Sequence, residues 1–127
     1  MSRQAVASPD APAAIGPYSQ AIEIDGFVFC SGQLGLDPAT GQLLEGVEDQ
    51  AERALLNLEA VLRAAGLTMA DVVKTSIFLA DLSHFAQVNA IYTRHVVEPA
   101  PARSTVQVAA LPRAALVEIE AIARRSS

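Results

Sequence analysis

The sequence predicts an α+β fold in which a mixed β-sheet is covered on one face by two helices. Alternating or β-branched runs, which are typical of strands, occur at 18–25, 27–31, 72–79, 103–108 and 117–123. Apolar residues at helical spacing occur within 48–65 and again after Ser83. In chain order these segments read β-β-α-β-α-β-β. Because most of the strands are not separated by helices, both helices are expected to pack on one face of the sheet.

The first two strands are predicted to form a hairpin. Ile22 and Ile24 alternate with Ala21 and Glu23, and Asp25-Gly26 then separates this run from 27–31. An Asp-Gly pair between two such runs is a strong hairpin signal. The residues before the hairpin are rich in Ala, Pro and Ser, and we expect the segment 1–12 to be irregular. A turn is predicted at 37–41, where Asp, Pro and Gly gather.

The first helix has the clearest pattern in the sequence. Its apolar stripe consists of Ala51, Ala54, Leu55, Leu58, Val61, Leu62 and Ala65. Glu48 and Asp49 suit the positive end of the helix dipole, and Gly66 is expected to close the helix.

The strand 72–79 precedes a second, shorter helix. We expect Ser83 to cap this helix, and its apolar stripe consists of Phe85, Val88, Tyr92 and Val96. Glu98-Pro99 should end it, because a residue before proline is forced out of the α region.

The last two strands carry charge where a sheet commonly buries apolar residues. Arg103, Thr105 and Gln107 share one face of the first strand, and Glu118 and Glu120 share one face of the second. If the strands pair as neighbours across 109–116, the guanidinium and the carboxylates lie together on the face away from the helices. This arrangement predicts a site for a small acid, on a face that other subunits would cover.

Composition limits the function classes. The 127 residues fit a single domain, 1–127, and the 24 alanines make a thin core that favours oligomerisation. With a net charge of −5 and a single lysine, the chain lacks the basic patch of a nucleic-acid-binding protein. No apolar stretch approaches the roughly 20 residues of a membrane span. Cys30 is the only cysteine, which favours a cytoplasmic protein without disulfides.

Arg103 and the two glutamates are the main candidates for chemistry. A guanidinium binds a carboxylate through two parallel hydrogen bonds, but Arg103 could instead form a purely structural ion pair with Glu118 or Glu120. One glutamate could activate water, whereas two carboxylates two residues apart also suit a solvated strand face. From the residues alone, the choice between Glu118 and Glu120 stays open.

The other candidates give weaker signals. Tyr18, Ser31 and Asn89 could orient a polar ligand, but serine and asparagine also bond to nearby backbone. Phe85 has the spacing of a core residue and is also a candidate to line the substrate site. Cys30 lies in an apolar run, which favours a buried inert thiol. Neither His84 nor His95 has a metal-ligand spacing, and we expect no metal.

Nearly the whole chain, from about residue 11 to 123, resembles the Rid (YjgF) family of reactive-intermediate deaminases, in particular its RidA branch. The segments that carry the resemblance include Gly16-Pro17-Tyr18-Ser19-Gln20, Ser31-Gly32-Gln33, Asn89 with Tyr92, Pro101-Ala102-Arg103-Ser104 and Glu118-Ile119-Glu120-Ala121.

The resemblance implies a chorismate-mutase-like α+β fold, assembled as a homotrimer with sites at the subunit interfaces. The implied activity is hydrolysis of 2-aminoacrylate and related imino acids, released by pyridoxal-phosphate enzymes, to 2-oxo acids and ammonia, without a cofactor. Arg103 matches the family's substrate-binding arginine and Glu118 its catalytic glutamate. Tyr18, Ser31 and Asn89 match further site positions. One departure is Thr105, which stands where many RidA members have cysteine.

Two other functions remain as alternatives. A trimer could use the same arginine to bind 2-oxo acids without turnover, as a sensor or chaperone, and the departure at Thr105 leaves room for this. Some relatives carry a ribonuclease or translation-inhibitor label, but the acidic charge and the lack of an aromatic and basic platform argue against nucleic-acid binding.

Overall fold

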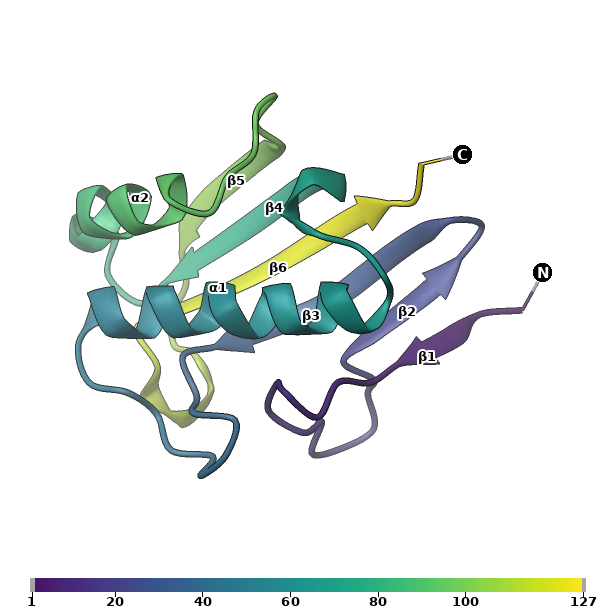
Figure 1. The fold of residues 1–127 in the computed structure, drawn as a ribbon. Coiled ribbons are helices and arrows are strands. Elements are labelled where there is room, and N and C mark those ends of the chain that lie inside the picture. Colours follow the sequence, from purple (N-terminus) through teal and green to yellow (C-terminus); the bar gives the residue numbers. More distant parts are fainter. Residues whose placement is uncertain (1, 127) are drawn as a thin grey trace.

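A computed structural model describes residues 2–126 and has two helices packed on one face of a mixed sheet (Figure 1). The strands are β1 (Gln4–Val6), β2 (Ala21–Ile24), β3 (Phe27–Leu34), β4 (Val72–Leu79), β5 (Ala102–Gln107) and β6 (Val117–Arg124). The helices are α1 (Val47–Ala64) and α2 (Phe85–Thr93). Short 3₁₀ turns occur at Met69–Asp71, Leu82–His84 and Pro112–Ala114. From β2 onward the predicted element order is confirmed.

The elements with strong local signals form where the sequence predicts them. Asp25 and Gly26 have φ values of 54° and 82°, as the tight turn between β2 and β3 requires. Helix α1 begins beside Glu48 and Asp49, and Gly66 follows it with a φ of 79°. The amide of Gly41 donates to the carbonyl of Asp37, which closes the predicted turn.

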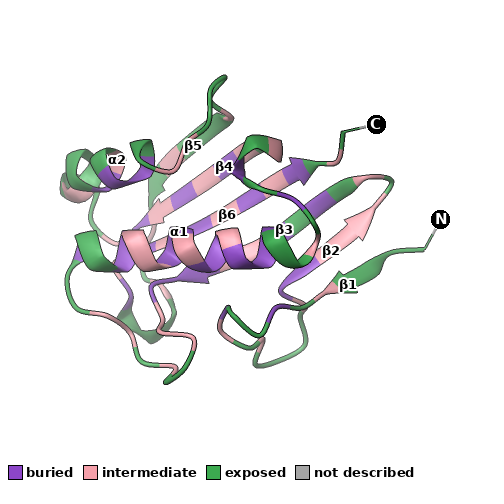
Figure 2. Ribbon diagram, viewed as in Figure 1, coloured by how far each residue is buried: buried purple, intermediate pink, exposed green. Residues whose placement is uncertain are grey.

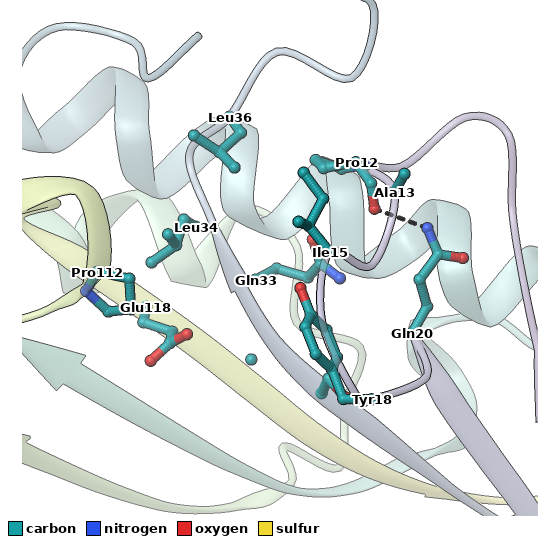
Figure 3. A pocket seen from close by; sticks show the side chains of 12 residues that line it. Pro12, Ala13, Ile15, Tyr18, Gln20, Gln33, Leu34, Leu36, Pro112 and Glu118 are labelled. Carbon is teal, nitrogen blue, oxygen red and sulfur yellow. Dashed lines mark hydrogen bonds between the residues drawn. The ribbon is translucent and has the colours of Figure 1, made fainter. Parts of the chain in front are cut away.

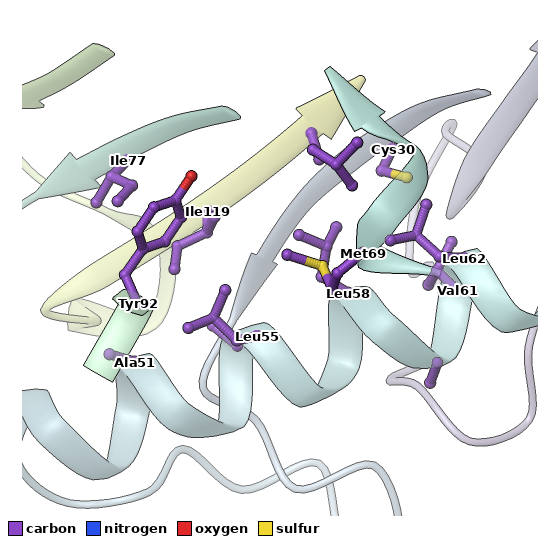
Figure 4. Close-up of a cluster of buried hydrophobic side chains, with 14 of the residues drawn as sticks. Cys30, Ala51, Leu55, Leu58, Val61, Leu62, Met69, Ile77, Tyr92 and Ile119 are labelled. Atoms are coloured by element: carbon purple, nitrogen blue, oxygen red, sulfur yellow. The ribbon is translucent and has the colours of Figure 1, made fainter. Parts of the chain in front are cut away.

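The core lies between α1 and the sheet. Leu55, Leu58 and Leu62 of α1 are fully buried, and Figure 4 shows Leu55 pointing toward the sheet, where Ile77 and Ile119 are also buried. Burying one such side chain contributes roughly 1.5–3 kcal/mol to folding. Figure 2 shows the buried side of α1 turned toward the sheet, whereas β5 is exposed along most of its length.

The predicted pairing of the last two strands is wrong. The sheet order over residues 2–126 is β1-β2-β3-β6-β4-β5, so β4 separates β5 from β6. Helix α2 explains the difference. It connects β4 to β5 as a crossover, and such a connection places the two strands parallel and side by side. Strand β6 then pairs antiparallel with both β4 and β3.

This topology places the basic and acidic residues on opposite faces of the sheet, which contradicts the predicted shared face. Arg103, Thr105 and Gln107 align with Thr75, Ile77 and Leu79 of β4, whose side chains are buried on the helix side. Glu118 and Glu120 align with Phe78 and Ser76, which point to the open side. The alternation within each strand is as predicted; the face that each set occupies is not.

The remaining differences are local. Strand β1 forms within the segment 1–12 and pairs with β2, so that segment is not wholly irregular. Strand β2 starts at Ala21 rather than at residue 18, and β3 continues beyond Ser31 to Leu34.

At the second helix, Ser83 is not the cap. It lies in a 3₁₀ turn, where its amide donates to Asp81, and His84 occupies the cap position of α2. Helix α2 ends at Thr93, before Glu98-Pro99. None of the helices in residues 2–126 has the length and hydropathy needed to cross a membrane.

Candidate functional site

Glu118 lines a cavity of about 420 Å³ on the open side of the sheet. The lining residues are Pro12, Ala13, Ile15, Tyr18, Gln20, Ser31, Gly32, Gln33, Leu34, Leu36, Pro112 and Glu118. Figure 3 shows Glu118 reaching into this cavity from β6, opposite Tyr18 and Ile15 on the N-terminal loop. Glu118 is the only charged residue in the lining, so the cavity presents one carboxylate within mainly apolar walls.

An irregularity in β3 makes room for that carboxylate. The pairing of β3 with β6 shifts its register between Cys30 and Gln33, and Gly32 lies at this bulge. A methyl group on Gly32 would come within 2.7 Å of Oε2 of Glu118. The position must therefore stay without a side chain for Glu118 to keep its present conformation.

The surroundings of Glu118 favour its protonated form. Burial raises the pKa of the Glu118 carboxyl above its ordinary value, and the like charge of Glu120 raises this pKa further. A carboxylate with a raised pKa is a stronger base, so Glu118 is suited to take a proton from a bound water molecule.

Hydrogen bonds hold the N-terminal loop against this cavity. The Gln20 side chain is buried and donates to the carbonyl of Pro12 over 2.7 Å (Figure 3). The hydroxyl of Ser31 donates to the carbonyl of Ser19 over 2.6 Å. Tyr18, by contrast, lines the same pocket and is 54% exposed. Ser31 thus shapes the wall, whereas Tyr18 is accessible to a ligand.

Arg103 lies on the other side of the sheet, against α2. Its Nη1 donates to Oδ1 of Asn89 over 2.7 Å. Its guanidinium carbon lies 5.5 Å from the ring centre of Phe85 and 5.1 Å from that of Tyr92. The three helical residues, at i, i+4 and i+7, form one stripe of α2, as their spacing requires. We call Phe85, Asn89 and Tyr92 the Arg103 cradle.

The guanidinium remains available to a ligand. The salt bridges within residues 2–126 join His95 to Glu52 and Glu59, and Arg125 to Glu23. Arg103 therefore has no carboxylate partner in this part of the chain, which rules out the predicted alternative of an internal ion pair with Glu118 or Glu120. A cavity of about 600 Å³ lies beside it, bounded by Asn89, Tyr92 and Pro101 among others.

Thr105 points to the same side as Arg103. Its Oγ1 is buried, and no group in the described chain lies within hydrogen-bonding distance of it. A buried hydroxyl without a partner is uncommon in folded proteins. The hydrogen-bonding capacity of this hydroxyl is therefore unused within the described chain.

The candidate residues thus form two clusters. Tyr18, Ser31 and Glu118 line the open-side cavity, whereas Arg103, Asn89, Phe85 and Thr105 gather on the helix side. A single chain does not bring the two clusters together.

Two residues of these clusters were not predicted from the sequence: Gly32 as a neighbour of Glu118, and Tyr92 as a neighbour of Arg103. Their signals were the glycine within Ser31-Gly32-Gln33 and the three-residue spacing from Asn89 to Tyr92.

Cys30 and the histidines take no part in either cluster. Cys30 is buried, and burial raises the pKa of its thiol to about 12, which agrees with an inert thiol. Among residues 2–126, no group of three or more His, Cys, Asp or Glu side chains has the arrangement of a metal site.

Comparisons with known proteins agree over nearly the full chain. Residues 8–125 match the family model described as Endoribonuclease L-PSP. A protein named 2-iminobutanoate/2-iminopropanoate deaminase from Mus musculus is 52% identical, over 95% of this chain and 90% of the relative. Protein DfrA from Myxococcus xanthus is 54% identical, over 97% of this chain and 96% of the relative.

Solved structures share the fold. RidA from an Antarctic Psychrobacter species has a TM-score of 0.93 at 48% identity, covering 95% of this chain and 98% of the other. The crystal structure of TdcF from E. coli with bound serine has a TM-score of 0.91 at 43% identity, covering 97% of this chain and 99% of the other.

Proposed function

Because the chain belongs to the Rid (YjgF) family, whose model is described as Endoribonuclease L-PSP, we propose that it hydrolyses 2-imino acids and their enamine forms, such as 2-aminoacrylate. The products are a 2-oxo acid and ammonia. The observation that carries the proposal is the position of Glu118, the single charged side chain that reaches into an otherwise uncharged cavity, where burial raises the pKa of its carboxyl. Relatives about 50% identical to this chain carry the name 2-iminobutanoate/2-iminopropanoate deaminase, which supports the same reaction class.

The reaction adds water across a carbon–nitrogen double bond and then expels ammonia. An enamine that takes a proton from solvent on carbon, or an imine that takes one on nitrogen, becomes the same iminium ion. Its carbon is electrophilic, and the water oxygen attacks that carbon. Glu118 accepts a proton from this water and returns it to the departing nitrogen. The carbon–nitrogen bond breaks as the new hydroxyl gives up its proton and becomes the carbonyl of the 2-oxo acid. This proton replaces the one taken up at the start, so the reaction consumes only water.

Arg103 binds the carboxylate that all these substrates carry. Its guanidinium can donate two parallel hydrogen bonds to a carboxylate, and Nη1 already has a fixed direction through Asn89. Backbone groups at Thr105, on the edge strand β5, can also bond to the substrate, and Phe85 limits the space beside Arg103. Tyr18 orients the imine on the Glu118 side, and the hydroxyl oxygen of Ser31, whose proton goes to Ser19, can accept a hydrogen bond from it. Free imines hydrolyse in water, so positioning supplies much of the acceleration.

Two copies of the chain must meet to complete this site, because Arg103 and Glu118 lie on opposite faces of one sheet. We propose a homotrimer in which the β5 edge of one subunit carries Arg103 to the Glu118 cavity of the next. Contacts between two different surfaces generate a closed ring when the rotation closes. The open face supports burial by other subunits, because Phe29 is 44% exposed there and Val106 46%.

We also propose a cytoplasmic location, on the ground that the only cysteine of the chain, Cys30, is buried as a free thiol.

A coupled assay tests the proposed function. A serine- or cysteine-degrading pyridoxal-phosphate enzyme releases 2-aminoacrylate, and pyruvate is followed with and without this protein, with no cofactor added for it. We expect faster pyruvate formation in proportion to the amount of protein. No acceleration, together with measurable pyruvate binding, would favour a non-catalytic 2-oxo acid-binding protein.

A further inference from the structure

A buried hydrogen bond lies directly behind the Arg103 cradle. The hydroxyls of Tyr92 on α2 and Thr75 on β4 share this bond over 2.7 Å. Tyr92 is 5% exposed and Thr75 is fully buried, so the bond lies out of reach of solvent. Figure 4 shows the Tyr92 ring extending from α2 toward the sheet, with its hydroxyl at the far end.

The ring of the same tyrosine also contacts the guanidinium of Arg103. The guanidinium carbon of Arg103 lies 5.1 Å from the centre of the Tyr92 ring, within the range of a cation–π contact. Arg103 is also the register partner of Thr75 across the β4–β5 pair. Thr75, Tyr92 and Arg103 therefore form a continuous path from the core of the sheet to an exposed charge.

The buried bond determines where the ring can lie. A phenol in a dry interior loses free energy unless its hydroxyl has a partner, and Thr75 is the partner at hydrogen-bond distance. While that bond exists, the hydroxyl end of Tyr92 is fixed against β4, and the ring presents a fixed face to Arg103. An arginine side chain has many rotamers, so a fixed ring on one side and Asn89 on the other greatly reduce its choices.

We propose that Thr75 and Tyr92 are positioning residues that set the direction of the Arg103 guanidinium. Neither is assigned a step of the reaction, because both act through Arg103: Thr75 is fully buried, and the hydroxyl of Tyr92 bonds to it. The inference rests on the proposed function, in which Arg103 binds the substrate carboxylate. If the carboxylate is bound equally in the ground and transition states, a misdirected guanidinium raises KM and leaves kcat largely unchanged.

Thr75→Val tests the inference, with Thr75→Ser as the matched control. Valine has nearly the shape of threonine but leaves the Tyr92 hydroxyl without its partner, whereas serine keeps the hydroxyl. We expect Thr75→Val to raise both KM for the imine and Kd for pyruvate by about 2- to 5-fold, the scale of an exposed cation–π contact. The kcat should change less than about twofold. Thr75→Ser should have wild-type values.

A double variant separates positioning from stability. Thr75→Val combined with Tyr92→Phe removes both hydroxyls, so thermal stability should recover relative to Thr75→Val alone, since no buried polar group lacks its partner. If the bond positions Arg103, KM and Kd stay raised in the double variant. Recovery of KM and Kd along with stability would make the pair purely structural. Should Thr75→Val fail to fold, Tyr92→Phe alone is measured against the same wild-type values.

The two proposals fail in distinguishable ways. A wild-type protein that binds pyruvate but does not hydrolyse imines would contradict the proposed function, and the pyruvate Kd series would still test the positioning. A wild-type protein that hydrolyses imines, beside a folded Thr75→Val variant with unchanged KM and Kd, would overturn the positioning alone.

Discussion

The Glu118 cavity and the Arg103 cradle differ in how they surround a charged side chain. Glu118 lies half-buried against Gly32 in an otherwise uncharged cavity, where burial and Glu120 raise its pKa. Arg103 lies exposed, and two aromatic rings and one amide oxygen contact it without neutralising it. One region therefore makes a carboxylate more basic, and the other keeps a cation free to pair.

This difference teaches why the two groups belong on separate surfaces. A guanidinium paired directly with Glu118 would stabilise the carboxylate and lower its pKa, whichever chain supplied it, and so weaken the base. A separate Arg103 can instead pair with the carboxylate of a ligand. Each chain then contributes one half of a site at two different places, and assembly joins the halves.

Glu118→Gln should have the largest effect on turnover. Glutamine keeps the shape of the side chain but cannot accept the proton, so kcat should fall by about 100-fold or more. The affinity for pyruvate should change little, because Arg103 still binds the carboxylate. Steady-state kinetics and calorimetric titration with pyruvate measure the two quantities. Near-normal turnover would mean that Glu120 or solvent, and not Glu118, is the base.

Arg103→Lys should have the next largest effect and separates geometry from charge. Lysine keeps the positive charge but replaces a planar fork by a point charge. We expect kcat/KM to fall by an amount equal to about 1.5–3 kcal/mol of transition-state stabilisation, and pyruvate to bind more weakly. Arg103→Ala should lower kcat/KM further. A folded Arg103→Ala variant with unchanged hydrolysis and unchanged pyruvate affinity would make Arg103 purely structural.

Glu120→Gln should shift the pH dependence of activity while leaving the base in place. The base must be unprotonated, so activity falls as the pH drops through the raised pKa of Glu118. Removing the charge of Glu120 lowers that pKa, so the acid limb of the kcat profile should move to lower pH. A limb that stays in place would mean that another group titrates there.

His95 follows the end of α2 and joins this end of the helix to α1, on which Glu52 and Glu59 lie. Its ring nitrogens lie 2.7 Å from a carboxylate oxygen of Glu59 and 2.8 Å from one of Glu52. Burial acts to lower the pKa of His95, but the two glutamates outweigh it, so the pKa is raised. The stabilisation is therefore full below about pH 6.5, the value of an unfolded histidine, and is lost as the pH rises through the raised pKa.

His95→Gln tests this smallest effect. The variant should lose roughly 1 kcal/mol of stability at pH 6, a modest value because both glutamates are partly exposed and solvent screens them. The loss should shrink toward pH 9. Thermal melts of both proteins across this range measure it, and a loss that grows with pH would contradict the assignment.

Sequence patterns predicted the local parts of the fold well and the long-range pairing poorly. The stripe of α1, the Asp25-Gly26 turn and the strand 72–79 depend on neighbours within a few residues, and all three formed as expected. The alternation of side chains along a strand correctly placed Arg103 and Val106 on opposite faces of β5. It could not say which face each set occupies, because that depends on which strand lies next to β5.

For the candidate site, too, local features could be predicted and long-range ones could not. The chemistry of Arg103 and Glu118 could be read from residue types and from the family resemblance. Their separation could not, because it results from the β4–α2–β5 crossover. Tyr92 was assigned to the core alone, although its ring has one edge in the core and one face against Arg103. A single apolar stripe does not distinguish these two environments.

Mixing two inactive variants tests the shared site most directly. Arg103→Ala and Glu118→Gln chains are unfolded, mixed in equal amounts and refolded together, and mass spectrometry under native conditions verifies that mixed trimers form. In a ring where neighbours supply the two halves, random mixing leaves both groups intact at about a quarter of the interfaces, so about a quarter of wild-type activity should return. If mixed trimers form and the activity stays at that of the separate variants, each site lies within one chain and the account is wrong.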